Sequence, residues 1–206
     1  MTTKEQPPTK RAADSLDWGK QAIDQLEWHW RGHLRPKLDG LTDEEYRWEP
    51  VPGMWSIRPR AEAVTSQAAG GGDLVADIAF PEPEPAPLTT IAWRMAHLSV
   101  GIFGIRASAH FGDGSMTYQG TVWPGTAKAA LAFLDEQYAA WMKGISGLDA
   151  EGLAKPCGPA EGPWAAAPFA ALILHINREA LHHGAELLLL RDLYRTSGAG
   201  QNWVTA

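Results

Sequence analysis

The chain has 206 residues, with 18 basic and 24 acidic side chains and a formal net charge of −6. Hydrophobic residues make up 45% of it, which is enough for the core of one domain and excludes a wholly disordered chain. The acidic balance argues against a nucleic-acid partner, because proteins that bind the phosphate backbone depend on clustered Lys and Arg. Seven histidines beside a single cysteine raise the question of whether some of them are metal ligands.

The sequence also predicts the cellular location of the protein. Its apolar runs are too short to span a bilayer, and residues 1–13 lack the apolar stretch of a secretory signal. One cysteine cannot form an internal disulfide, which agrees with a reducing cytosol. We therefore expect a cytoplasmic protein without a membrane partner, with a flexible tail at 1–13, one domain at 14–198 and a C-terminal tail at 199–206.

The first predicted helix runs from Asp14 to Asp39 and is capped by Asp14 or Ser15. Its apolar residues recur at spacings of three and four on one face, at Ile23, Leu26, Trp30 and Leu34. Thr42, followed three residues later by Glu45, then indicates a short helical turn over 41–46.

A connection over residues 47–88 follows, with many Pro and Gly residues. Residues 74–80 alternate weakly and predict a short strand, which could pair with residues near 55–60 in a hairpin. Helix–helix connections usually have about 2–8 residues. This one must therefore either cross the length of a helical bundle or cover a site.

Three further helices are predicted over 89–111, 126–143 and 168–195. Thr126 is the expected cap of the second of these, and Gly144 is expected to end it. Arg191 and Arg195 lie near the end of the last helix, where the helix dipole favours cations. Four helices with one long and two shorter connections predict an all-α four-helix bundle, with the long crossover between the first two helices.

A polar stripe lies on the last predicted helix, in line with residues that should be core. Its members are His175, Glu179, His182, His183 and Glu186. A buried charge needs a partner or a metal ion, because its desolvation costs several kcal/mol. Polar residues at positions that should be apolar are typical of a functional site.

Helical spacing narrows the set of candidate ligands. Glu179 and His183 are four residues apart and could reach one ion, and so could His175 and Glu179. His175 and His183 lie about 12 Å apart along the axis and cannot easily share an ion. The best third ligand is His97 on the helix over 89–111. Two histidines and one carboxylate form the ligand set of catalytic zinc sites and of non-haem iron sites.

An alternative without a metal fits the same residues. In it Glu179 accepts hydrogen bonds from His97 and His183 inside a polar core network. Gly101 and Gly104, on the stripe of His97, indicate either close helix packing or space kept open beside His97.

The sequence resembles the DinB-like superfamily of four-helix bundles, which includes mycothiol-dependent maleylpyruvate isomerase and related thiol S-transferases. The resemblance rests on Trp55-Ser56, on TTIAWRMAHL at 89–98 with its single histidine, on HINREALHHGAELLLLRDLY at 175–194, and on the order of the elements. These stretches cover most of residues 14–195. About thirty extra residues between Trp55-Ser56 and the next helix depart from the family pattern, so the residues at the mouth of the site cannot be carried over.

The resemblance implies an up-up-down-down bundle, often dimeric, with zinc or nickel at the site. By position, the family's metal ligands are His97, Glu179 and His183. The family often has histidine where Glu179 stands, and the glutamate is similar to the maleylpyruvate isomerase branch. The implied chemistry is that the ion binds a small-molecule thiol, whose thiolate then attacks an electrophilic substrate.

Two functions are therefore expected. The first is a metal-dependent thiol S-transferase or isomerase with a low-molecular-weight thiol cosubstrate and a small-molecule substrate. The alternative is a non-catalytic, dimeric helical bundle whose His/Glu stripe is structural or binds a small ligand. His175 and His182 could orient Glu179 or His183, or could be ordinary core residues.

The remaining candidates have simpler interpretations. His29 and His33 are four residues apart, but no third ligand obviously joins them, so we expect a solvated or capping role. His110 suits the end of its helix. Cys157 has no basic neighbour nearer than Lys155 to lower the pKa of its thiol, so any reactive thiol is expected to come from a cosubstrate. Trp18, Trp28 and Trp30 lie on several faces of the first helix, where a homodimer contact could form.

Overall fold

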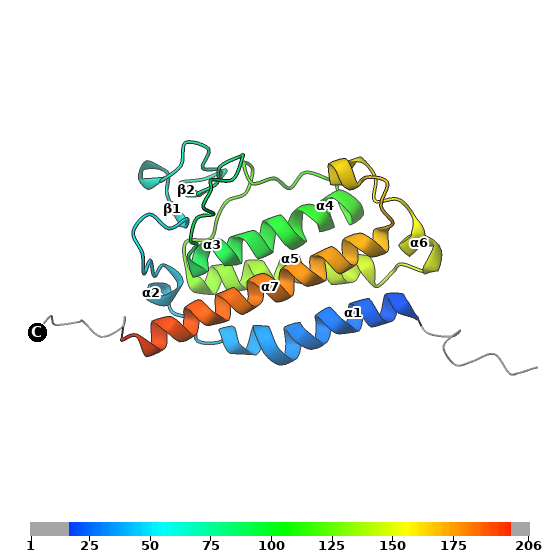
Figure 1. The fold of residues 1–206 in the computed structure, drawn as a ribbon, viewed down its shortest axis with the longest axis horizontal. Helices are drawn as coiled ribbons and strands as arrows, with labels where there is room; N and C mark the ends of the chain where they lie inside the picture. The colour runs from blue at the N-terminus through cyan, green and yellow to red at the C-terminus, as the bar shows by residue number, and fades with distance from the viewer. Residues whose placement is uncertain (1–16, 199–206) are drawn as a thin grey trace, which may run out of the picture.

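The computed structural model describes residues 17–198, and these residues form a bundle of four long helices (Figure 1). The four are α1 (Trp18–His29), which continues without a break through η2 (Trp30–Leu34) and η3 (Arg35–Leu38); α3 (Ile91–Ala96), which continues through η5 (His97–Gly104) and α4 (Ile105–Phe111); α5 (Ala127–Ile145); and α7 (Phe169–Thr196). We call the first two the α1–η3 helix and the α3–α4 helix. The expected all-α fold is confirmed.

The connections contain short elements. They are α2 (Asp43–Tyr46), β1 (Ile57–Pro59), η4 (Arg60–Glu62), β2 (Leu74–Ala76), α6 (Ala150–Ala154) and η6 (Pro159–Trp164). The predicted hairpin is present, because β1 pairs antiparallel with β2 and Arg58 faces Val75. No described helix is long and apolar enough to cross a membrane.

Side-chain caps fix most helix starts. Thr42, Thr90 and Thr126 each accept a hydrogen bond from the backbone N–H three residues later, which satisfies a donor that the helix itself leaves free. Thr42 and Thr126 are the caps expected from the sequence. The α1–η3 helix is capped by Asp17. The expected caps Asp14 and Ser15 lie outside the described residues, as do the tails at 1–13 and 199–206.

Helix directions follow from contacts at the two ends of each pair. The α1–η3 helix and α7 are parallel, because Asn177 donates to the carbonyl of Ala22 and Arg191 donates to that of Asp39. The α3–α4 helix is antiparallel to α7, because its Arg94 contacts Glu186 whereas its His110 packs on Phe169.

The α3–α4 helix and α5 are parallel. Phe103 packs on Tyr138, and Phe111 packs on Trp141, so the two helices run in the same direction. The order is therefore up-down-down-up (Figure 1). The expected up-up-down-down order is wrong.

The order of helix directions depends on which connection between helices runs along the length of the bundle. The long segment before α3 leaves and returns at one end of the bundle, where the Trp55 N–H bonds the Leu88 carbonyl. Residues 112–126 instead run back along the bundle from the end of α4 (Figure 1). They bring the first amide of α5, Ala127, within 2.7 Å of the Asp43 carboxylate.

All four long helices contribute to the core. Its fully buried members include Leu26, Leu34, Phe103, Leu134, Trp141 and Ile173. Within it Trp30 stacks on Tyr138, with the ring centroids 4.0 Å apart and the planes at 5°. The core holds the α3–α4 helix against α7, and the polar stripe of α7 lies at that contact.

Candidate metal centre

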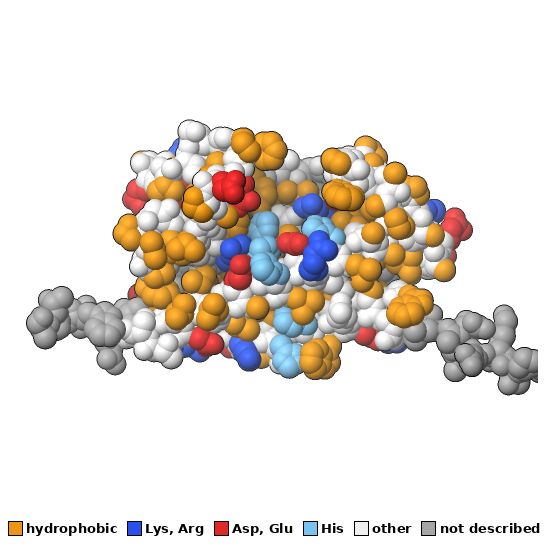
Figure 2. All heavy atoms as spheres, viewed as in Figure 1, with side chains coloured by type: hydrophobic (Ala, Val, Ile, Leu, Met, Phe, Trp, Pro, Cys, Tyr) orange, Lys and Arg blue, Asp and Glu red, His pale blue; other side chains and the backbone are white. Residues whose placement is uncertain are grey.

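The polar stripe of α7 faces the α3–α4 helix. Figure 2 shows histidine, arginine and acidic side chains gathered in a hollow, between the part of the molecule that carries β1 and β2 and the part around α6. His97, at the start of the π-helical stretch η5, meets His183 of α7 edge to face, with ring centroids 4.7 Å apart. A π-helical turn at a polar cluster is typical of functional positions.

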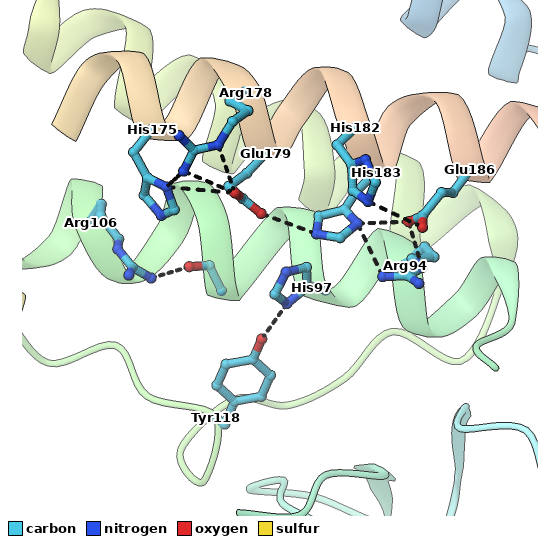
Figure 3. A network of polar contacts seen from close by, with 11 residues as sticks. Arg94, His97, Arg106, Tyr118, His175, Arg178, Glu179, His182, His183 and Glu186 are labelled. Atoms are coloured by element: carbon cyan, nitrogen blue, oxygen red, sulfur yellow. Dashed lines mark hydrogen bonds and ion pairs between the residues drawn. The ribbon is translucent and has the colours of Figure 1, made fainter. Parts of the chain in front are cut away.

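Three residues from these two helices could hold one ion. One ligand atom each of His97, Glu179 and His183 lies within 4.8 Å of the other two. His183 Nε2 and Glu179 Oε2 are 3.3 Å apart. Ligand atoms bound to a tetrahedral zinc ion at about 2.0–2.2 Å lie about 3.3 Å from one another. The donor types and this spacing therefore fit a divalent metal ion. Figure 3 shows the side chains of His97, Glu179 and His183 beside one another.

His97 is held by a tyrosine from the segment that follows α4. The Tyr118 hydroxyl lies 3.2 Å from His97 Nδ1 (Figure 3), so Nε2 is the ring nitrogen left for an ion. A Cβ at Gly101 would collide with the Tyr118 hydroxyl and would lie 2.9 Å from His97 Nδ1. Gly101 thus keeps space open beside His97, one of the two roles expected from the sequence. A Cβ at Gly104 would collide with Met116, so Gly104 serves close packing.

Burial sets the charge state of this pair. It lowers the pKa of His97 to about 3, with further lowering by His183, Arg94 and Arg106. Burial also raises the pKa of Tyr118 to about 12. His97 is therefore a neutral imidazole near pH 7, which is the form that binds metals. Its ring also stacks on Trp93 at 5.1 Å, which fixes the ring plane.

The other side of His183 contacts a carboxylate and an arginine. Its Nδ1 is 2.7 Å from Glu186 Oε2 and 3.0 Å from Arg94 Nη1. An arginine N–H can only donate a hydrogen bond, so Arg94 can bond to Nδ1 only when Nδ1 carries no proton. The contact with Glu186 instead requires a proton on Nδ1. The shorter, charge-assisted contact favours a proton on Nδ1 that Glu186 accepts, and this leaves the Nε2 lone pair facing Glu179. Arg94 Nε then binds Glu186 Oε2 at 3.0 Å.

A second group of candidate ligands shares His183. His182, His183 and Glu186 also place ligand atoms within 4.8 Å of one another. However, the Arg94 guanidinium lies 3.0 Å from both His183 Nδ1 and Glu186 Oε2, where its charge would repel a cation. The group with His97 has no such arginine between its ligand atoms in Figure 3.

The structure also places the two histidines expected to orient ligands. His175 Nδ1 lies 3.6 Å from Glu179 Oε1 and 2.6 Å from Arg178 Nη2. His182 is exposed, and its Nε2 lies 3.4 Å from Glu186 Oε1. His175 is thus beside Glu179, and the His182 ring meets the His183 ring edge to face, with centroids 4.9 Å apart.

The other candidates lie apart from this centre. His29 and His33 stack on each other on the α1–η3 helix, and burial lowers the pKa of His29. His110 bonds Glu161 of η6 at 2.9 Å. Cys157 is buried, which raises the pKa of its thiol, so it lacks the activation that a nucleophile needs.

Sequence reasoning did not identify Arg94 or Tyr118 as residues that support the centre, and it placed Glu186 in the polar stripe without a role. Glu186 and Arg94 each lie one helical turn from a proposed ligand, so the three-residue spacing from His183 and His97 could have identified them. Tyr118 comes from an irregular segment, and nothing in its sequence neighbourhood indicates the contact with His97.

The fold and the site define a helical-bundle protein with a candidate centre made of two histidines and one carboxylate. Residues 73–187 match the family model of the DinB superfamily. The chain belongs to the DinB superfamily. Searches of curated proteins and of solved structures gave no significant match.

Proposed function

We propose that the protein binds one divalent metal ion, zinc or nickel, through His97 Nε2, a Glu179 carboxylate oxygen and His183 Nε2. The observation that carries this proposal is the convergence of three ligand atoms from two helices within 4.8 Å. Nitrogen and oxygen donors of this kind suit zinc and nickel. The alternative group with His182 is disfavoured by the Arg94 guanidinium at its centre.

The neighbouring residues prepare these donors. Tyr118 accepts from His97 Nδ1–H, and Glu186 accepts from His183 Nδ1–H, so each imidazole presents Nε2 to the ion. Arg94 holds Glu186 in place. Trp93 covers one face of the His97 ring. A bound divalent ion would act as a Lewis acid that favours the thiolate form of a coordinated thiol.

We further propose that the protein is a metal-dependent thiol S-transferase or isomerase of the cytoplasm. Membership of the DinB superfamily supports this by analogy. The chain supplies no activated thiol of its own, because its single cysteine is buried away from the centre. The sulfur would therefore arrive with a low-molecular-weight cosubstrate, and the small-molecule substrate would be an electrophile.

Metal content tests the first part. Wild type, His97→Ala, Glu179→Ala, His182→Ala and Glu186→Ala would each be saturated with zinc or nickel, dialysed and analysed by mass spectrometry. We expect stoichiometric metal in wild type and His182→Ala, and large losses in His97→Ala and Glu179→Ala. Full occupancy in His97→Ala together with loss in His182→Ala would assign the ion to the other group and refute the proposal.

Thiol binding tests the second part. The loaded protein would be titrated with mercaptoethanol, cysteine and glutathione, with cobalt in place of zinc so that sulfur coordination changes the visible spectrum. Sulfur coordination that depends on His183 supports the proposal. If the metal binds and no thiol enters its coordination sphere, the non-catalytic function gains support instead.

The expected homodimer also stays a proposal. Trp18 and Trp28 of α1 are 72% and 69% exposed, and Trp18 borders an apolar groove of about 380 Å³ between α1 and α7. Analytical ultracentrifugation of wild type and Trp18→Ser tests it. A wild-type dimer that dissociates in the variant is expected, whereas a wild-type monomer would exclude it.

A further inference from the structure

A second hollow lies between α4, α5 and the segment that follows α4, and it contains no residue of the candidate metal centre. It is a groove of about 470 Å³, and small-molecule sites commonly measure about 300–1,000 Å³. Along the α3–α4 helix, Tyr118 packs at Gly101, beside His97. Met116 packs about one helical turn further on, at Gly104, and these two residues line the groove. The groove is therefore a separate site.

Ser108 fixes one wall of the groove. Its carbonyl oxygen accepts hydrogen bonds from the N–H groups of Gly112 and Gly114. Its hydroxyl oxygen accepts a further one from the Met116 N–H at 3.2 Å. These bonds hold the segment after α4 in place, so the groove needs little rearrangement to receive a ligand.

The Phe111 ring provides an apolar wall. It lies directly on the backbone of α5 at Gly144, where an added Cβ would collide with it. The ring also contacts the rings of Trp141 and Phe169, which restrict its movement. Phe111 nevertheless remains 38% exposed. A fixed aromatic ring with an accessible part can pack on a planar ligand.

Gln137 of α5 also lines the groove, and it is only 6% exposed. Its side-chain amide makes no hydrogen bond with another described residue, and such a group is costly to bury. The amide is nevertheless still accessible, unlike the Tyr138 hydroxyl and Trp141 Nε1, which are both fully enclosed and unpaired. A molecule in the groove could therefore complete its hydrogen bonds.

The chemistry of the lining indicates the kind of ligand. A glutamine amide offers an acceptor oxygen and donor N–H groups side by side, which match the C=O and N–H of another amide. Phe111 and Met116 offer apolar surface for a ring. Lys143 is the only charged residue of the lining, and it is exposed. A neutral ligand therefore suits the groove better than an anion.

We propose that this groove binds a small, neutral, planar amide. The C=O and N–H of the ligand pair with the side-chain amide of Gln137, and its ring packs on Phe111 and Met116. This site is independent of the proposed function, because none of its residues belongs to the metal centre.

Benzamide, acetophenone and benzoate form a matched set of probes, because they share the ring and carbonyl group and differ in one substituent. Each would be titrated into the 15N-labelled full-length protein, with and without zinc, and followed by two-dimensional NMR. We expect benzamide to shift the backbone amides of Gly104, Ser108, Gly112 and Gly144. Benzamide should bind about fivefold or more tightly than acetophenone, which lacks the N–H donor.

Variants locate the binding. Gln137→Leu keeps an apolar lining of similar size, and it should abolish the preference for benzamide over acetophenone. Ala140→Met, at an exposed position of α5 that lines the groove, should weaken the binding of both probes by filling the space. Ala139→Met is the control, because Ala139 is exposed on the same helix and lies outside the lining. Thermal melting checks the fold of each variant.

Four results would overturn the inference. They are the absence of these shifts at the solubility limit of benzamide, an unchanged preference in folded Gln137→Leu, equal losses in Ala139→Met and Ala140→Met, and benzoate that binds at least as tightly as benzamide. Shifts centred on His97 and His183, or binding that needs zinc, would assign the probe to the metal centre and would also overturn it. Benzamide binding at the groove in a protein that takes up no metal supports this site and refutes the metal centre.

Discussion

His183 Nδ1 lies 2.7 Å from the carboxylate of Glu186, on the opposite side of the imidazole ring from Glu179. One helical turn of α7 thus supplies a candidate ligand and the group that fixes its proton. Glu186 belongs to the polar stripe seen in the sequence, but its role depends on which ring nitrogen faces the α3–α4 helix. That orientation is a property of the packed bundle.

The first prediction concerns Glu186. Glu186→Gln removes the anionic acceptor of His183 Nδ1–H, so zinc affinity measured by competition with a chromophoric chelator should fall about 10–100-fold. Glu151→Gln is the control, because Glu151 is exposed on α6. Equal affinities in wild type and Glu186→Gln would show that His183 needs no such partner.

The second prediction concerns Gly101. An added Cβ would collide with Tyr118 and crowd His97, so Gly101→Ala should lower the free energy of unfolding by about 1–3 kcal/mol and also weaken metal binding. Gly32→Ala is the matched control, because a Cβ there meets nothing within 4 Å. Chemical denaturation should show it unchanged or more stable by about 0.4–1 kcal/mol. If Gly101→Ala were as stable as Gly32→Ala, the space beside His97 would have no role.

The third prediction is a pH dependence of the metal-free protein. The pKa of His97 falls from its ordinary 6.5 to about 3 on folding, so between these values the unfolded chain binds more protons at this residue. The contribution of His97 to the free energy of unfolding is fully present above pH 6.5 and is lost as the pH falls. About 2 kcal/mol of it is lost at pH 5. Urea denaturation at pH values from 7.5 to 5 should therefore show a smaller loss of stability in His97→Gln than in wild type. A loss as large in the variant would contradict the buried neutral imidazole.

The fourth prediction tests how α7 is anchored. Arg191 is 1% exposed and contacts the Glu45 carboxylate at 2.8 Å and the Asp39 carbonyl at 2.8 Å. Arg191→Met leaves Glu45 buried without its main partner and should cost about 3–5 kcal/mol of stability. Arg195→Met, at a half-exposed position, should cost less than about 1 kcal/mol. Adding Glu45→Met to Arg191→Met should recover part of the loss, and a purely additive result would count against the ion pair.

Local sequence signals predicted much of this fold. Thr42 and Thr126 cap helices because their hydroxyls satisfy backbone donors within the same turn, and that interaction needs no tertiary context. The alternation at 74–80 located β2 because its residues pair within a local hairpin. Helical spacing placed Glu179 and His183 on one face of the last helix, and the resemblance to the DinB-like superfamily joined His97 to them; the structure brings ligand atoms of all three together.

Long-range contacts account for what the sequence did not predict. Arg191 was expected to serve the dipole of its own helix, yet it binds carbonyls at the end of the α1–η3 helix. The order of helix directions depends on residues 112–126 running along the bundle, and no periodicity encodes that path. Tyr118 reaches His97 only because the same segment passes the open side of Gly101.

The most direct test of the central claim is a crystal structure of the metal-loaded protein, with anomalous diffraction collected above and below the absorption edge of the bound metal. We predict one anomalous peak, bounded by His97, Glu179 and His183, with Glu186 on the far side of the His183 ring. A peak among His182, His183 and Glu186, or no peak at either group in a protein saturated with zinc or nickel, would contradict the account.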